Sequence, residues 1–118
     1  MSDYLPHGRG KRGESLAAEY LARHGYTVVA QNYRYRRSEI DLIVQQKRTL
    51  VFVEVKLRKN GAYGPPESFV EPSQADRIIT AAEHYLHETD WDGDIRFDVV
   101  AITLQPRFNL KHFEDAFY

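Results

Sequence analysis

The sequence predicts a three-layer α/β/α domain in which a central mixed sheet of about five strands carries one helix on each face. The chain has 118 residues, which is the size of one domain. Segments with helical spacing of apolar residues are separated by blocks of β-branched and aromatic residues. The segment 50–57 is apolar on both faces apart from Glu54 and Lys56, which is typical of a central strand covered on both sides.

The expected order of elements is one helix, three strands, a second helix and two strands. The first helix is ended by Gly25, and Pro72 suits the first position of the second. The helices are expected at residues 13–24 and 72–87. The strands are expected at residues 26–33, 39–45, 50–57, 95–104 and, as a short last strand, 108–113. The polar residues 46–49 indicate a hairpin between the second and third strands, and a loop rich in Gly and Pro covers 59–71.

Composition excludes several classes of protein. The chain has no cysteine, which excludes disulfides, thiolate metal sites and cysteine nucleophiles. No apolar stretch approaches the roughly 20 residues that span a bilayer, so no membrane association is expected. The basic segment 1–12 lacks the apolar region of a secretory signal and is expected to be flexible. A cytoplasmic location is therefore expected.

Positive charge is concentrated in three short segments, although the formal net charge is only −1. These segments hold nine of the 16 Lys and Arg residues: Arg9, Lys11 and Arg12; Arg34, Arg36 and Arg37; and Lys56, Arg58 and Lys59. If the fold brings them together, one face is positive and suits the phosphate backbone of a nucleic acid. The alternative is three separate, solvated surface runs.

The spacing of three charged residues indicates a catalytic site. Glu54 and Lys56 are two apart on a strand, so their side chains share one face. A two-residue turn or a four-residue loop in the hairpin puts Asp41 directly opposite Glu54. Their Cβ atoms would then lie about 4.5–5.5 Å apart. A three-residue loop would shift the register and remove this opposition.

Two carboxylates at that distance repel each other unless a proton or a cation lies between them. Mg²⁺, or Mn²⁺ in its place, suits such a pair, because it binds one or two carboxylates together with water and substrate phosphates. The carbonyl of Val55 is a further candidate ligand. Lys56 could orient or deprotonate a metal-activated water, or stabilise negative charge in the transition state. The alternative is a surface ion pair between Glu54 and Lys56 at a strand end, with Asp41 as an ordinary edge acid.

Further residues have two possible roles each. Glu14 could reach the metal from the first helix, or could be an acid favoured by the dipole in the first helical turn. Gln74 could hydrogen-bond a phosphate or a water, or could be a plain surface residue. The segment 32–37 interleaves tyrosine and arginine, which suits stacking on bases and contact with phosphate, or a solvated hairpin edge. Arg96 and Asp98 are expected to form an ion pair with no catalytic part, and His84 and His87 to be surface residues.

Several motifs, in order, resemble the YraN family of small bacterial proteins. They are Gly13-Glu14 at a helix start, Asn32-Tyr33-Arg34, Glu39-Ile40-Asp41-Leu42-Ile43, Val51-Phe52-Val53-Glu54-Val55-Lys56, Arg96-Phe97-Asp98-Val99-Val100 and the ending His112-Phe113-Glu114-Asp115-Ala116-Phe117. That family is similar to the PD-(D/E)XK nuclease superfamily, with its restriction-endonuclease-like fold, and in pattern to archaeal Holliday-junction resolvases.

The resemblance implies catalytic roles for Asp41, Glu54 and Lys56, and a further role for Glu14. One departure concerns the second helix. In the family it usually opens with a basic run that contains lysine, whereas here Gln74 stands where the lysine is expected. This departure weakens the case for phosphate contact by the second helix.

Three functions follow as hypotheses. The first is a divalent-metal-dependent endonuclease that hydrolyses phosphodiester bonds in DNA, with branched or damaged DNA as candidate substrates. A domain this small presents little surface to a branched duplex, which favours a symmetric homodimer. The second is a non-catalytic nucleic-acid-binding module with a nuclease-like fold. The third is a structural or protein-interaction domain, which predicts no metal binding.

Overall fold

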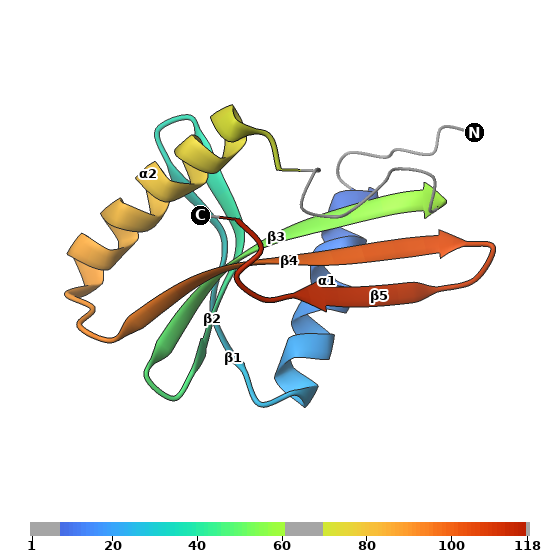
Figure 1. The fold of residues 1–118 in the computed structure, drawn as a ribbon, viewed down its shortest axis with the longest axis horizontal. Coiled ribbons are helices and arrows are strands. Elements are labelled where there is room, and N and C mark those ends of the chain that lie inside the picture. The colour runs from blue at the N-terminus through green and yellow to red at the C-terminus, as the bar shows by residue number, and fades with distance from the viewer. Residues whose placement is uncertain (1–7, 61–69, 118) are drawn as a thin grey trace.

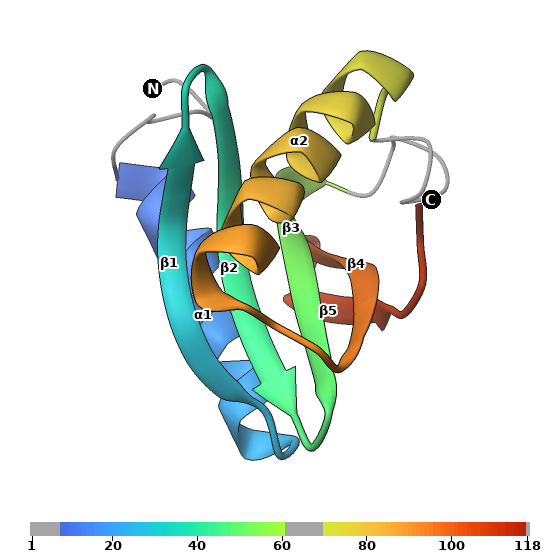
Figure 2. The same ribbon diagram turned by 90° about the vertical axis from the view of Figure 1, so that its left-hand side faces the viewer.

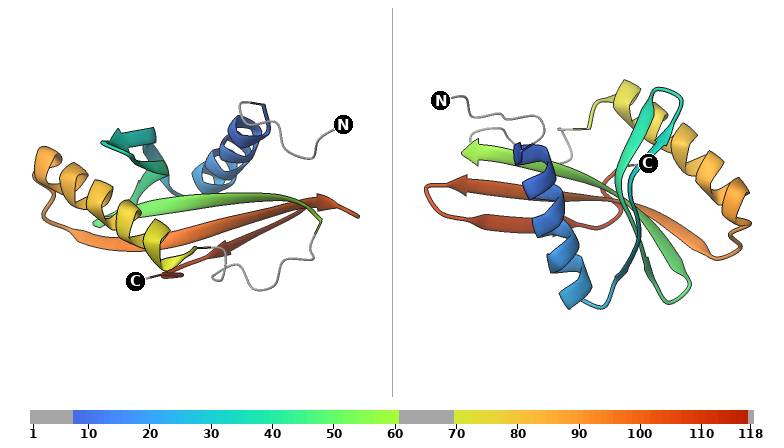
Figure 3. Two further views of the ribbon diagram at one scale, coloured as in Figure 1. Left: turned by 90° about the horizontal axis from the view of Figure 1, so that it is seen from above. Right: turned by 180° about the vertical axis from the view of Figure 1, so that it is seen from behind.

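Two helices cover opposite faces of one sheet in the computed structural model, which describes residues 8–60 and 70–117, with side chains described for 12–58 and 70–117. In this part of the chain the elements are α1 (Gly8–Arg23), β1 (Thr27–Tyr35), β2 (Ser38–Gln46), β3 (Thr49–Asn60), α2 (Pro72–Thr89), β4 (Asp94–Gln105) and β5 (Asn109–Phe113). Figure 1 shows α2 on the near face, and the view from behind in Figure 3 shows α1 across the other face. The predicted α/β class is confirmed.

The five strands lie in the sheet in sequence order, β1-β2-β3-β4-β5. Neighbouring strands are antiparallel except β3 and β4, which are parallel, so the sheet is mixed as predicted. A parallel pair requires a crossover connection, and α2 provides it. Strand β3 is central, with β2 on one side and β4 on the other. This position explains why its sequence is apolar on both faces.

The predicted register between β2 and β3 is confirmed wherever the two strands pair. Gln46 lies opposite Thr49, and the ladder continues to Leu42 opposite Val53. The connection is a two-residue turn in which Lys47 has a φ of 55°. The pairing ends one step before Asp41 and Glu54.

Several element boundaries differ from those expected. Helix α1 begins at Gly8 instead of at the expected residue 13, so residues 8–12 are helical. Arginine and lysine are good helix formers, and they extend a helix whose later turns pack on the sheet. Residues 1–7 lie outside the described part. Strand β3 continues to Asn60 because it pairs with β4 as far as Gln105.

The apolar residues form one cluster on each face of the sheet. On the α1 side, Ala17 and Leu21 pack with Val51, Val53 and Val100. On the α2 side, the helix residues Ile78, Ala81 and Ala82 pack against a set of sheet residues that includes Ile43, Phe52 and Phe97. Alternate residues of the central strands therefore serve different helices, as the period of a strand requires. Neither described helix combines the length and apolar character needed to cross a bilayer.

Gly13 is buried where α1 approaches β3. A Cβ atom there would lie 3.3 Å from the Cβ of Leu57 and 3.6 Å from Cγ1 of Val55. Gly13→Val is therefore expected to destabilise the fold by about 1–3 kcal/mol through overpacking, although valine favours a helix more than glycine does. Chemical denaturation measures the effect, with Ser15→Val on the exposed side of α1 as the matched control. Equal effects of the two substitutions would show that the close approach has no energetic consequence.

Candidate active site

The candidate site lies where β2 separates from β3. Beyond Leu42, β2 pairs only with β1, and Ile40 lies opposite Tyr33. Figure 2 shows the closed end of the β1–β2 hairpin extending apart from β3. Asp41 stands at the point of divergence, where its Oδ2 accepts a hydrogen bond from the backbone N–H of Val55 at 2.8 Å. A side-chain carboxylate thus occupies the place that a neighbouring strand's carbonyl would take.

Asp41, which is half-buried, and Glu54, which is buried, form a pair of interacting carboxyl groups. Burial, and then the charge and hydrogen bond of Glu54, raise the pKa of Asp41 from 3.8 to about 9. The Val55 N–H opposes this shift, and the charge of Glu14 adds to it. The pair therefore holds a proton at neutral pH, as two close carboxylates must in the absence of a cation.

Lys56 and Gln74 complete the group on the α2 side. Lys56 Nζ lies 3.2 Å from Oε2 of Glu54, and these two side chains are only 14% and 8% exposed. Gln74 Nε2 donates to the same Oε2, and its Oε1 accepts from Lys56 Nζ at 3.3 Å. The alternatives of a surface ion pair at a strand end and of a plain surface glutamine are therefore wrong. Gln74 contacts the two charged residues of β3 directly.

The oxygen atoms at this position fit a hard divalent cation. Val55 donates its N–H toward Asp41, and in a strand the carbonyl of the same residue points to the same side. That carbonyl therefore faces the gap beside the Asp41–Glu54 pair. No group of three or more His, Asp or Glu within 8–60 and 70–117 is arranged to hold a metal ion. Two carboxylates and a backbone oxygen, completed by water, form a donor set that suits Mg²⁺ or Mn²⁺.

Glu14 approaches the pair from α1. Asn32 has a φ of 51°, a left-handed conformation that asparagine tolerates, and its Nδ2 donates to Glu14 Oε1 at 2.7 Å and to Glu39 Oε2 at 3.0 Å. This contact ties α1 to the β1–β2 hairpin. Because α1 begins at Gly8, Glu14 lies beyond the first helical turn, and its interpretation as a first-turn acid is wrong.

The side chains of the three basic segments differ in their exposure to solvent. Arg12, Arg34, Arg36 and Arg37 are exposed, and Arg34 also pairs with Glu39 at 3.2 Å. Lys56 belongs to the buried site instead of the surface, and Arg58, which is half-buried, donates to the carbonyl of Leu57 at 3.2 Å. The side chains of Arg9, Lys11 and Lys59 lie outside the described residues.

The tyrosines of the hairpin pack on α2. Tyr33 Oη lies 2.7 Å from Nδ1 of His84, and the ring of Tyr35 stacks on His84 with centroids 3.9 Å apart. Arg36 lies over the Tyr35 ring, 5.1 Å from its centroid. Stacking of these tyrosines on bases stays a prediction, whereas His84, which was expected to be a surface residue, is a packing partner of both. Strand periodicity explains this, because residues 33 and 35 share the face toward α2.

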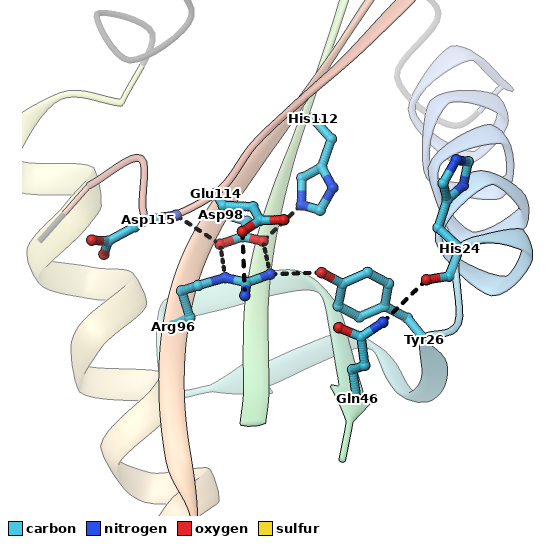
Figure 4. A network of polar contacts seen from close by, with 8 residues as sticks. All are labelled: His24, Tyr26, Gln46, Arg96, Asp98, His112, Glu114 and Asp115. Carbon is cyan, nitrogen blue, oxygen red and sulfur yellow. Dashed lines mark hydrogen bonds and ion pairs between the residues drawn. The ribbon is translucent and has the colours of Figure 1, made fainter. Parts of the chain in front are cut away.

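A second polar network lies on the α1 side of the sheet (Figure 4). Asp98 is fully buried and accepts two hydrogen bonds from Arg96, one from His112 at 2.7 Å and one from the N–H of Asp115 at 3.0 Å. Arg96 also donates to Tyr26 Oη at 2.7 Å. Burial raises the pKa of Asp98, but its hydrogen bonds outweigh this and hold the pKa below its ordinary value. The expected ion pair is confirmed, whereas sequence reasoning missed the parts of His112 and Asp115.

Comparison of the sequence with known proteins finds relatives of similar length. The sequence-family model of the "Uncharacterised protein family UPF0102" matches residues 13–102. A UPF0102 protein of Flavobacterium psychrophilum is 40% identical over 110 residues, which are 92% of each chain. One of Chlorobium limicola is 44% identical over 124 residues, covering 98% of this chain and 96% of the relative.

A solved structure shares the fold at low sequence identity. It is the 1.6 Å resolution structure of Archaeoglobus fulgidus Hjc, a Holliday junction resolvase from an archaeal hyperthermophile. The TM-score is 0.58 with 17% identity, over 87% of this chain and 73% of that one. At this identity the similarity concerns the arrangement of helices and strands.

Proposed function

Because this chain belongs to the uncharacterised protein family UPF0102 (the YraN family) and has a resolvase-like fold, we propose that it is a divalent-metal-dependent endonuclease acting on DNA. One observation carries the proposal. The carboxyl groups of half-buried Asp41 and buried Glu54 lie together at the end of a strand ladder, with the ammonium of Lys56 3.2 Å from Glu54. Without a cation the pair avoids repulsion by holding a proton, and a bound divalent cation would take the place of that proton.

Each residue of the site has a defined part in the proposed hydrolysis. The carboxylates of Asp41 and Glu54 and the carbonyl of Val55 would hold Mg²⁺ or Mn²⁺. Bound there, the cation supplies Lewis acidity that lowers the pKa of a water and neutralises charge on a phosphodiester. Lys56 Nζ would orient the attacking water and stabilise the negative phosphoryl oxygens. The attacking water loses one proton as its oxygen bonds to phosphorus, and the leaving oxygen gains one proton as its P–O bond breaks.

The exposed arginines of the β1–β2 hairpin would hold the DNA backbone. Arg34, Arg36 and Arg37 lie on the arm that begins at Asp41, so a phosphate on this arm is directed toward the carboxylate pair. Guanidinium groups bind phosphate through paired hydrogen bonds. Glu14, tied to the hairpin through Asn32, would contact a metal-bound water. Binding is expected to weaken steeply with salt because it depends on these few charges.

Branched DNA is the proposed substrate class. The Archaeoglobus fulgidus protein with a similar fold is a Holliday junction resolvase. A four-way junction is resolved by two cuts, and one chain has one such site, so two copies related by symmetry would act together. The dimer belongs to the proposal, with DNA as the partner and Mg²⁺ or Mn²⁺ as the cofactor.

Cleavage of defined DNA substrates tests the proposal. Four-way junctions, linear duplexes and single strands are incubated with the protein and Mg²⁺, Mn²⁺ or Ca²⁺, or with a chelator. Cutting that requires Mg²⁺ or Mn²⁺, favours the junction and is lost in Glu54→Ala is the expected result. Metal-dependent cutting that survives Glu54→Ala unchanged would refute the assignment of the site.

A non-catalytic DNA-binding module is the second candidate. Two observations favour it: the formal net charge is −1, and Lys56 is engaged by Glu54 and Gln74. Such a module would bind DNA in a salt-sensitive manner without cutting it under any metal. Binding by fluorescence anisotropy over a salt series, measured beside the cleavage assay, distinguishes the two candidates.

A further inference from the structure

We propose that Gln74 is a positioning residue of this site, whose side-chain amide fixes the orientations of the Glu54 carboxylate and the Lys56 ammonium. This inference rests on the proposed function for its catalytic consequence. Its structural part, a defined hydrogen-bonded triad on the α2 face, can be measured in the metal-free protein whether or not the protein cuts DNA.

Both ends of the amide are used. Gln74 Nε2 donates to Oε2 of Glu54, and Gln74 Oε1 accepts from Nζ of Lys56 at 3.3 Å. Lys56 Nζ also lies 3.2 Å from the same Oε2. The three groups thus close a ring of contacts. Two donors on one oxygen restrict the rotation of the carboxylate, and Oε1 is then the oxygen that can turn toward a cation shared with Asp41.

The backbone of Gln74 is held in place by the packing of α2. The residue stands in the first turn of the helix, two positions after Pro72. Ile78 lies one turn further on the same side of the helix and is 3% exposed within the apolar cluster on the α2 face. Core packing therefore sets the distance between the amide and β3. A group on a rigid element can hold its partners within the narrow tolerance that catalysis needs.

Glutamine has the hydrogen-bonding chemistry that this position needs. Its amide has a donor end for the carboxylate of Glu54 and an acceptor end for the ammonium of Lys56. A glutamate would keep an acceptor and lose the donor, and a lysine would keep donors and lose the acceptor. Methionine has a similar length but offers no N–H donor and only a weak acceptor, so Gln74→Met removes the contacts with little change in volume.

The first experiment observes the contacts without metal or DNA. Lysine ammonium groups held by hydrogen bonds exchange slowly enough to give proton–nitrogen NMR signals, and the Lys56 signal is identified by its loss in Lys56→Met. The signal is expected in the wild-type protein and in the control Ser73→Ala, which changes an exposed neighbour. It is expected to broaden or vanish in Gln74→Met and to persist in Gln74→Glu, which keeps the acceptor. An unchanged Lys56 signal in Gln74→Met would overturn the proposal.

The second experiment separates positioning from folding and from binding. Gln74→Met is expected to lower kcat by about 10- to 100-fold with little change in KM, as loss of a group that orients a ligand does. Its Tm is expected to stay within about 2 °C of the wild type. Gln74→Glu is expected to lose activity too, because the donor to Glu54 is missing. Wild-type kcat in Gln74→Met would overturn the catalytic part of the proposal.

The two proposals fail in different ways. If the wild-type protein does not cut DNA under any metal, the endonuclease proposal fails. The NMR comparison of Gln74→Met with Ser73→Ala still decides whether Gln74 holds Lys56 in place. If the wild type does cut DNA, the kcat of Gln74→Met decides whether that contact serves the reaction.

Discussion

Replacing Asp41 with asparagine is expected to abolish metal-dependent cleavage and to stabilise the metal-free protein. Asparagine keeps an acceptor for the N–H of Val55 and offers a donor to Glu54, so the local geometry is retained. It cannot act as an anionic ligand. Loss of the negative charge is expected to lower cleavage on the order of a thousandfold and to remove measurable binding of Mn²⁺.

The gain in stability follows from the proton held by the carboxylate pair. The pKa of Asp41 is raised to about 9 in the folded protein, while the unfolded chain has the ordinary value of 3.8. Between about pH 4 and about pH 9 the folded state therefore binds one more proton than the unfolded state. Stability falls as pH rises through this window, by at most about 1.4 kcal/mol for each pH unit. An asparagine side chain cannot ionise, so the Asp41→Asn variant lacks this loss.

Denaturation of the metal-free proteins at about pH 6 and about pH 8 measures the difference. Asp41→Asn is expected to be more stable than the wild type, with the larger advantage at the higher pH. The matched control is Asp92→Asn, because the side chain of Asp92 is 91% exposed and is not part of the site. Loss of cleavage together with lower stability would instead identify Asp41 as a structural residue. The same proton predicts that Mn²⁺ binds more tightly as pH rises toward about 9.

Asp98→Ala is expected to have the largest effect on folding. The carboxylate of Asp98 is fully buried, and it neutralises Arg96 and accepts a hydrogen bond from His112, whose side chain is 7% exposed. Removing one partner of a buried charged pair typically costs about 3–5 kcal/mol, because the remaining charge loses its compensation. The hydrogen bond to the N–H of Asp115 is lost too, which loosens the segment after β5.

Chemical denaturation of Asp98→Ala and of the control Glu114→Ala measures this contribution. Glu114 lies 3.6 Å from Arg96, but its side chain is 60% exposed, so less than about 1 kcal/mol is expected for it. Acid titration adds a second test. Since the pKa of Asp98 is lowered in the folded protein, its contribution is present above the ordinary aspartate pKa and is lost as pH falls through the lowered value. Similar destabilisation by both substitutions would contradict this account of the network.

Local sequence patterns were sufficient to predict most of the fold. The apolar run of β3, the turn at Lys47 and Arg48 and the helical period in α2 are all set by neighbouring residues, and each was predicted close to its observed place. The register of β2 against β3 follows from the length of one turn, so the sequence alone already brought Asp41 to the level of Glu54. Boundaries at β3 and α1 were less predictable, because pairing with β4 and packing on the sheet extend those elements.

By itself, then, the sequence determined the order of the elements and the register of the β2–β3 hairpin. That register identified Asp41, Glu54 and Lys56 as a group. Tertiary structure alone decided that β2 leaves β3 at Asp41, that Gln74 bridges Glu54 and Lys56, and that Asn32 holds Glu14. The physical reason is the range of the interactions. Turn length and side-chain alternation act between neighbours in the chain, whereas these contacts join residues 14 to 20 positions apart, whose approach depends on how two helices pack on a twisted sheet.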